Sequence, residues 1–224
     1  DDWQRRLLES DHPRILINAS RQVGKSTITG LLAVRQALDH PGLILCCAPS
    51  QRQSSELFRK IRSTLVHLNV EFSLDSATKV ELPNGSRIIT LPGSEATVRG
   101  YSAPGLILVD EASRVPDDFY AAIRPMLAAG NGRLVVLSTP WGRRGWYFQA
   151  HEFGGDTWER YRVPASDCPR ITQDFLDEEL RELGPLRFAS EYRCEFIDAA
   201  EALFPSGLIE AAMCDDLEPL WIMS

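Results

Sequence analysis

The chain has 224 residues, 44% of them apolar, and a formal net charge of −7 at pH 7. This composition is typical of a globular protein with a sizeable core, in one domain or one domain with an appendage. It includes no apolar run near the roughly 20 residues that a membrane-spanning helix needs, and no secretory signal, so we expect neither a membrane partner nor secretion. Because the chain starts at Asp1 instead of methionine, we expect it to be a piece of a longer or processed protein.

Strand-like and helix-like segments alternate over the first 140 residues. Apolar runs predict strands near residues 14–18, 43–47, 106–110 and 134–138, and helical spacing predicts helices at 26–38, 51–66 and 117–129. Repeated β–α alternation indicates an α/β fold with a mainly parallel central sheet flanked by helices on both faces.

The first strand leads into a segment with the pattern of a phosphate-binding loop, Ala19-Ser20-Arg21-Gln22-Val23-Gly24-Lys25-Ser26. In such a loop the backbone N–H groups cradle the phosphates of a nucleotide triphosphate, the lysine reaches the β- and γ-phosphates, and the serine hydroxyl binds Mg²⁺. Ala19 stands where the motif usually has its first glycine, and this restricts the backbone there. The alternative is an incidental surface turn with a solvated lysine.

Residues 78–91 interrupt the alternation. The segments 78–82 and 86–91 flank Pro83-Asn84-Gly85, which predicts an antiparallel hairpin with a tight turn. We expect this hairpin either to extend the sheet or to lie across its edge.

The strand at 106–109 is apolar throughout and ends in two acids, Asp110 and Glu111. A continuous apolar run is typical of a buried parallel strand, and ligands bind beyond the carboxyl ends of such strands. We therefore expect Asp110 to hold Mg²⁺ beside the loop and Glu111 to act as the general base that polarises the attacking water. The alternative is a buried strand capped by two solvated acids.

The pattern changes after Pro140. One strand is predicted from Trp158 to Val163, followed by helices at 172–183 and 185–194. Small residues, prolines and adjacent acids in 198–224 predict a linker.

Charge and cysteine content limit the partners. The half 1–112 holds 13 basic and 12 acidic residues and the half 113–224 holds 11 and 19, so any surface that binds nucleic acid must be local. The 21 arginines suit bidentate phosphate contacts, although a genomic arginine bias explains them equally well. No cysteine spacing resembles a zinc site, so we expect reduced thiols in a cytosolic compartment. The cysteines are Cys46, Cys47, Cys168, Cys194 and Cys214.

Several short motifs follow one another in a fixed order. They are Trp3-Gln4, the loop from Ser20 to Ser26, Val98-Arg99-Gly100-Tyr101-Ser102-Ala103, Leu108-Val109-Asp110-Glu111-Ala112, Ser138-Thr139-Pro140-Trp141-Gly142, Glu195-Phe196 and Leu203-Phe204-Pro205. Over residues 2–206 this series resembles the ATPase domain of the large terminase subunit, the DNA-packaging motor of tailed bacteriophages. The resemblance implies a P-loop NTPase of the additional-strand, catalytic-glutamate class, with the added hairpin and a small helical C-terminal portion.

The resemblance also implies residue roles. Gln4 would contact adenine, with Trp3 packed beside it or simply anchoring an N-terminal helix. Arg21 would sense the γ-phosphate, and Ser138-Thr139 would couple hydrolysis to movement, unless they only form a strand-ending turn. The residues that bind ATP would be Gln4, Ala19, Ser20, Arg21, Gln22, Val23, Gly24, Lys25, Ser26 and Thr27.

Arg99 precedes the Asp110 strand in a segment predicted to be a loop. In ring ATPases a neighbouring subunit supplies an arginine that stabilises the charge on the γ-phosphate. The resemblance implies that Arg99 has this role in trans; the alternative is a loop arginine that pairs with Glu95 or is solvated.

The resemblance implies an ATP hydrolase that drives double-stranded DNA into a procapsid, in a homo-oligomeric ring with the portal and the small terminase subunit, in the host-cell cytoplasm. DNA would be held by its phosphates, independently of sequence. We expect an ATPase domain at 1–198 and a linker at 199–224 toward an absent nuclease domain, hence no nuclease activity. The alternatives are a helicase-like translocase, a nucleotide-dependent switch and a P-loop kinase.

Overall fold

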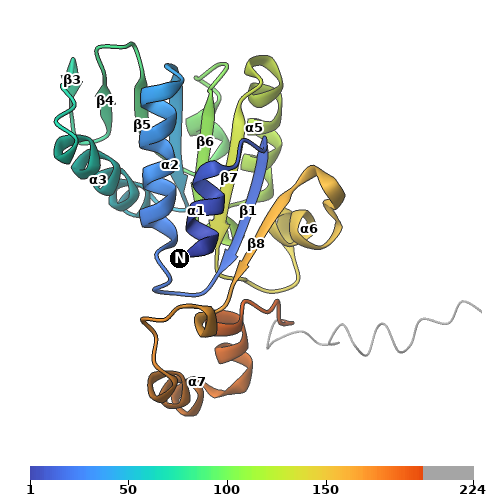
Figure 1. Cartoon of the computed structure of the whole chain (residues 1–224). Coiled ribbons are helices and arrows are strands. Elements are labelled where there is room, and N and C mark those ends of the chain that lie inside the picture. Colours follow the sequence, from blue (N-terminus) through green and yellow to red (C-terminus); the bar gives the residue numbers. More distant parts are fainter. Residues whose placement is uncertain (199–224) are drawn as a thin grey trace, which may run out of the picture.

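The computed structural model describes residues 1–198, which form one eight-stranded sheet with helices packed on both of its faces (Figure 1). The strands are β1 (Arg14–Ala19), β2 (Leu43–Ala48), β3 (Leu74–Asp75), β4 (Lys79–Glu81), β5 (Arg87–Pro92), β6 (Leu106–Asp110), β7 (Arg133–Ser138) and β8 (Glu159–Val163). The helices are α1 (Asp2–Glu9), α2 (Lys25–Asp39), α3 (Gln51–His67), α4 (Glu95–Val98), α5 (Asp117–Gly130), α6 (Gly145–Phe153) and α7 (Gln173–Arg193).

The strand order is β3-β4-β5-β2-β6-β7-β1-β8. From β5 to β8 all neighbouring strands pair in parallel. Strand β7 lies between β1, which carries the loop, and β6, which ends in the acids, so the additional-strand class predicted for the fold is confirmed. The carboxyl ends of β1, β6 and β7 therefore meet at one edge of the sheet, which is where ligands bind in such folds.

The predicted hairpin is also confirmed. Strand β4 pairs antiparallel with β5, and β3 pairs antiparallel with β4, so the hairpin extends the sheet at its far edge. Asn84 and Gly85 form the tight turn, with Gly85 at φ +90°.

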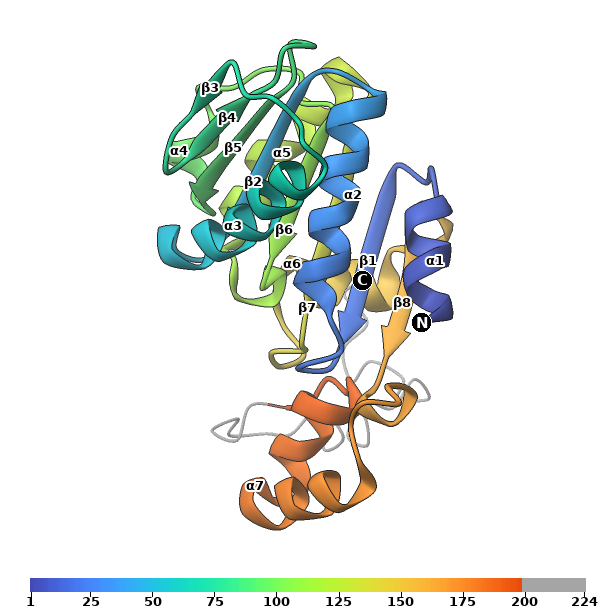
Figure 2. The same ribbon diagram turned by 60° about the vertical axis from the view of Figure 1, so that its left-hand side comes forward.

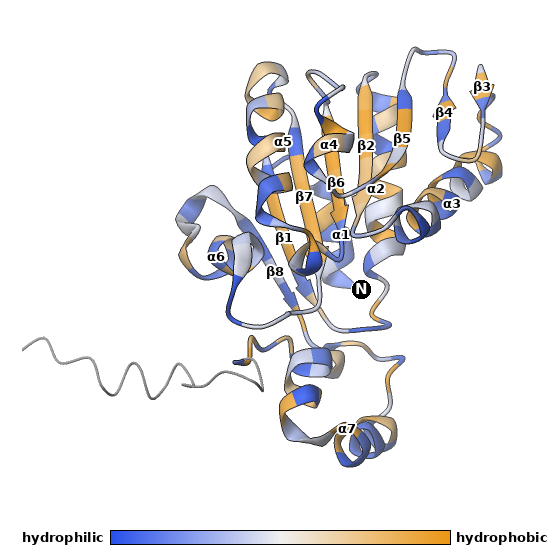
Figure 3. Ribbon diagram, turned by 180° about the vertical axis from the view of Figure 1, so that it is seen from behind, coloured by the Kyte–Doolittle hydropathy of each residue, from blue (hydrophilic) through white to orange (hydrophobic). Residues whose placement is uncertain are grey.

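Two apolar cores lie on opposite faces of the sheet. Helices α1, α2 and α3 pack on one face, and α4, α5 and α6 on the other. The adjacent residues Cys46 and Cys47 of β2 contribute to opposite cores, as the period of a strand requires. Figure 3 shows the result as apolar strands enclosed by helices with polar outer surfaces. None of the helices in residues 1–198 has the length and apolar character needed to cross a membrane.

The C-terminal portion lies beyond the carboxyl ends of β1 and β8 (Figures 1 and 2). The two helices predicted there are the two parts of α7, which is interrupted at Gly184 (φ 74°, ψ 165°). A small core that includes Leu176, Phe188 and Tyr192 holds the parts together. Helix α6 was not predicted, because its aromatic residues follow no clear helical period. The linker predicted for 199–224 lies outside the described residues.

Candidate nucleotide-binding site

The phosphate-binding loop begins at the end of β1. Ala19 is the last residue of that strand, pairs with Val163 of β8 and is fully buried. Its backbone is extended, a conformation that alanine adopts as readily as glycine, so this departure from the usual motif does not restrict the loop. The unusual backbone occurs later, at Gln22 (φ 63°) and Gly24 (φ 91°), and α2 starts at Lys25.

Lys25 lies inside the loop. Its Nζ donates hydrogen bonds to the carbonyl oxygens of Ala19 and Ser20, both at 2.9 Å. Burial lowers the pKa of Lys25, and the negative charges of Glu111 and Asp110 oppose that shift. The ammonium group is thus held at the centre of the loop, where the phosphates of a nucleotide would lie.

Ser26 and Asp110 come together as the sequence predicts. The Ser26 hydroxyl donates to Asp110 Oδ2 at 3.2 Å, and Asp110 Oδ1 accepts from the backbone N–H of Glu111 at 2.9 Å. Burial raises the pKa of Asp110, which a nearby cation would counteract. A hydroxyl and a carboxylate oxygen are the hard ligands that Mg²⁺ prefers, so these two residues fit that ion.

Glu111 follows β6 with a left-handed backbone (φ 51°, ψ 42°). A residue other than glycine in this conformation costs free energy and is found mainly at functional sites. Burial raises the pKa of Glu111, and Lys25 opposes the shift. Its carboxylate lies beside the loop, with Oε2 3.5 Å from the Ser138 hydroxyl.

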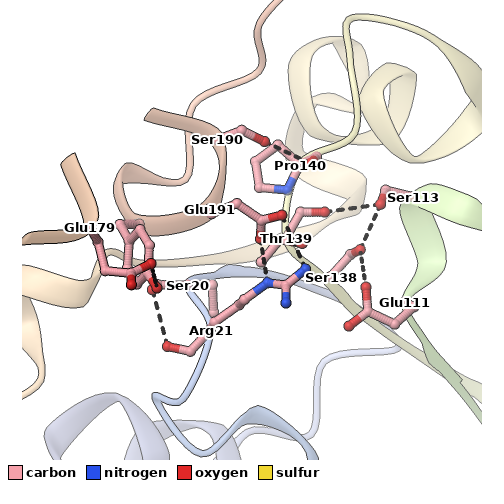
Figure 4. A network of polar contacts seen from close by, with 12 residues as sticks. Ser20, Arg21, Glu111, Ser113, Ser138, Thr139, Pro140, Glu179, Ser190 and Glu191 are labelled. Carbon is pink, nitrogen blue, oxygen red and sulfur yellow. Dashed lines mark hydrogen bonds and ion pairs between the residues drawn. The ribbon is translucent and has the colours of Figure 1, made fainter. Parts of the chain in front are cut away.

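Arg21 has a partner that the sequence did not indicate. Its Nε and Nη2 donate to the two carboxylate oxygens of Glu191 in α7 at 2.6 and 3.1 Å, and its backbone N–H donates to the Glu191 carbonyl at 3.3 Å (Figure 4). The hydrogen bond to Glu191 raises the pKa of Arg21. The Glu191 side chain is only 10% exposed, so the pair fastens α7 to the loop. No local pattern could have revealed a contact between residues 170 positions apart.

The coupling residues Ser138 and Thr139 are buried at the end of β7. The Ser113 hydroxyl, in the 3₁₀ turn η1 (Ala112–Arg114), lies 2.7 Å from Ser138 Oγ and donates to the Thr139 carbonyl at 2.9 Å (Figure 4). Ser113 was not predicted as a site residue, although it lies only two residues after Glu111.

A cavity of about 960 Å³ runs along the loop. It includes the predicted residues Gln4, Arg21, Gln22, Gly24, Lys25, Ser26, Thr27 and Glu111, and the unpredicted residues Gln53, Lys60, Arg114 and Arg170. The Gln4 amide comes from α1. Arg170 reaches the same end of the cavity from the segment before α7, with Nη2 3.5 Å from the Val23 carbonyl. Ala19, Val23, Ser138 and Thr139 lie behind the cavity wall.

Arg99 lies apart from this cavity. It caps the one-turn helix α4, where a loop was predicted, and its side chain is 72% exposed. It forms an ion pair with Glu95 one helical turn away, as one of the two alternatives required. A role in trans needs an arginine that points away from its own site, so that role stays a prediction.

Gly24 provides a test of the loop geometry. We expect Gly24→Ala to abolish nucleotide binding, because a Cβ at φ +91° is strained and would lie 3.1 Å from Gln4 Nε2. Gly85→Ala is the matched control, since Gly85 has φ +90° and open space around the added Cβ. Both variants should lose ~1–2 kcal/mol of unfolding free energy. Nucleotide titration and thermal unfolding measure the two effects, and unchanged binding by Gly24→Ala would contradict the assigned loop.

These features define a class. A loop of this kind after β1, acids at the end of β6 and an additional strand between them are the features of a P-loop NTPase of the additional-strand, catalytic-glutamate class. Residues 16–211 match the family model described as terminase large subunit, T4likevirus-type, N-terminal. The chain therefore belongs to this family of large terminase subunits.

Individual relatives agree with the family. The chain is 27% identical over 169 residues to a probable terminase large subunit of Enterobacteria phage P7, covering 66% of the chain and 34% of that protein. It is 25% identical over 230 aligned positions to the terminase large subunit of Thermus virus P23-45, covering 84% and 46%. The chain thus spans less than half the length of these curated relatives.

Solved structures share the fold. The large terminase ATPase domain of Thermus phage P74-26 superposes with a TM-score of 0.73 at 20% identity, covering 87% of this chain and 92% of that domain. The large terminase of another thermophilic bacteriophage, in complex with ADP, also has a TM-score of 0.73, at 11% identity, covering 86% and 52%. The fold class predicted from the sequence is therefore confirmed.

Proposed function

We propose that this chain binds ATP with Mg²⁺ and hydrolyses it to drive double-stranded DNA into a viral procapsid. One observation carries the proposal. The Ser26 hydroxyl and the Asp110 carboxylate meet at 3.2 Å, and Glu111 reaches the same cavity as Lys25. The thermophilic bacteriophage terminase that was solved with ADP was also solved with ATP-γ-S, and both complexes support ATP as the ligand.

The binding roles follow from position. The loop N–H groups from Gln22 to Ser26 and the Lys25 ammonium would bind the phosphates, as at other phosphate-binding loops. Gln4, at the α1 end of the cavity, would contact adenine. Ser26 and Asp110 would hold Mg²⁺, which supplies charge neutralisation at the β- and γ-phosphate oxygens.

The catalytic roles lie around the γ-phosphate end. Glu111 would accept a proton from the attacking water, a task suited to a carboxylate whose pKa burial has raised. Arg21 would contact the γ-phosphate after exchanging Glu191 for it, and Arg99 of a neighbouring subunit would complete the site. Ser138 and Thr139, adjoining Glu111, would couple hydrolysis to movement of the C-terminal portion.

The proposed assembly extends beyond the chain. A ring of copies would act with the portal and the small terminase subunit on the procapsid, in the host-cell cytoplasm, and would grip DNA by its phosphates. One structural neighbour comes from the phi29 viral genome packaging motor assembly (TM-score 0.53). We propose residues 1–198 as the ATPase domain and no nuclease activity for this chain.

The alternatives predict different behaviour. A nucleotide-dependent switch has no need of Glu111 beside the metal ligand. A helicase-like translocase would separate strands, and a P-loop kinase would transfer phosphate to an acceptor. The position of Glu111 favours hydrolysis by water.

The test measures ATP turnover against protein concentration, with and without duplex DNA and over a salt series. We expect turnover per subunit to rise with concentration, and the DNA stimulation to fall as salt rises because phosphate contacts release counterions. Lys25→Ala should lose nucleotide binding and turnover together. Tight ATP binding with no turnover at any concentration would favour the switch, and strand separation would favour the helicase.

A further inference from the structure

Four residues next to the loop form a continuous set of polar contacts, shown in Figure 4. Ser113 Oγ donates to the Thr139 carbonyl at 2.9 Å and lies 2.7 Å from Ser138 Oγ. Ser138 Oγ in turn lies 3.5 Å from Glu111 Oε2. Ser138 and Thr139 are buried, with exposures of 0% and 4%, so water has little access to them.

These three contacts have only two protons between them when Glu111 is ionised, as a general base must be. Each serine hydroxyl has one proton and can donate one hydrogen bond. If Ser113 donates to the Thr139 carbonyl, Ser138 must donate to Ser113. The Ser138 proton is then not available to the Glu111 carboxylate, which agrees with the 3.5 Å separation of that pair against 2.7 and 2.9 Å for the other two.

We propose that Ser113 is a positioning residue of the ATPase site: by engaging the Ser138 hydroxyl it keeps Ser138 from holding the Glu111 carboxylate, which is left free to turn toward water. The proposal rests on the function proposed above. It also works in reverse. When Glu111 turns to Ser138 and takes its proton, Ser113 must donate to Ser138 and release the Thr139 carbonyl. The coupling segment thereby registers the position of Glu111.

The experiment compares Ser113→Ala, Ser113→Thr, Ser138→Ala and the double variant Ser113→Ala/Ser138→Ala. In Ser113→Ala the Ser138 hydroxyl is free to bond Glu111, so kcat should fall ~10- to 100-fold, the scale of a misplaced catalytic group, with KM for ATP unchanged. Ser113→Thr keeps the hydroxyl and should restore kcat. The double variant lacks the hydroxyl that would hold Glu111, so its kcat should exceed that of Ser113→Ala.

Ser86→Ala controls for loss of a buried hydroxyl. Ser86 Oγ donates to the Ala37 carbonyl at 2.6 Å near the hairpin, so this variant should lower Tm and leave kcat unchanged. A Ser113→Ala enzyme with the parent's kcat, or a double variant no faster than Ser113→Ala, would overturn the proposal.

A stability measurement keeps this test separate from that of the proposed function. The thermal unfolding of the parent, the two alanine variants and the double variant needs no turnover. The Tm loss of the double variant should be smaller than the sum of the two single losses, because both single variants break one shared hydrogen bond. Additive losses would overturn the Ser113 proposal even if the parent hydrolyses no ATP, whereas non-additive losses in an inactive parent would leave it standing and count against the proposed function alone.

Discussion

Glu111→Gln is expected to lower ATP turnover by ~10²- to 10⁴-fold, the contribution of a positioned general base. The amide has nearly the same shape as the carboxylate but cannot accept a proton from water. Binding of ATP should persist, since Lys25, Ser26 and Asp110 are unchanged and no negative charge is added. Steady-state turnover together with titration of a fluorescent ATP analogue measures both effects.

Glu56→Gln is the matched control, because Glu56 is a partly exposed glutamate on α3 paired with Arg59. It should leave turnover at the parent's level. Full turnover by Glu111→Gln would show that another group activates the water, and the proposed mechanism would lose its base.

Arg99→Ala is expected to lower turnover by ~10³- to 10⁵-fold under conditions in which copies assemble, the range measured for arginines supplied in trans. At low concentration, where subunits act alone, parent and variant should be equally slow. The reason is geometric: the exposed Arg99 side chain lies apart from its own cavity and can serve only that of a neighbour.

Mixing two inactive variants separates the trans role from a cis one. Arg99→Ala keeps an intact site, and Glu111→Gln keeps Arg99, so mixed assemblies should regain turnover. A mixture that stays inactive would contradict the trans assignment. Arg59→Ala is the control, because Arg59 is similarly exposed and pairs with Glu56 one turn away.

The sequence predicted those parts of the site that depend on local pattern. The loop after β1, the acids after β6 and the turn at Asn84-Gly85 each follow from a few consecutive residues whose backbone requirements are specific. The parallel sheet then brings together strand ends that are far apart in the sequence. That is why Ser26 could be placed beside Asp110 without a structure.

Contacts between the C-terminal portion and the loop could not be predicted. Glu191 looks like any acid of an amphipathic helix, and only the fold of α7 against β1 brings it to Arg21. Ser113 and Arg170 were missed for a similar reason: a single serine or arginine in a short turn carries no periodic signal. Ala19 illustrates the opposite case, since the sequence departed from the motif at a position where the strand continues and glycine has no advantage.

The pairing of Arg21 with Glu191 also bears on where the protein can be shortened. Glu191 supplies two side-chain acceptors and one backbone acceptor to Arg21 of the loop, and its neighbour Ser190 donates to the Pro140 carbonyl just after the coupling residues. A fragment that stops at β8 would contain every motif of the phosphate-binding loop and its acids. It would nevertheless leave the Arg21 guanidinium without its carboxylate and the end of β7 without its brace. The smallest fragment that preserves the site therefore includes the whole of α7.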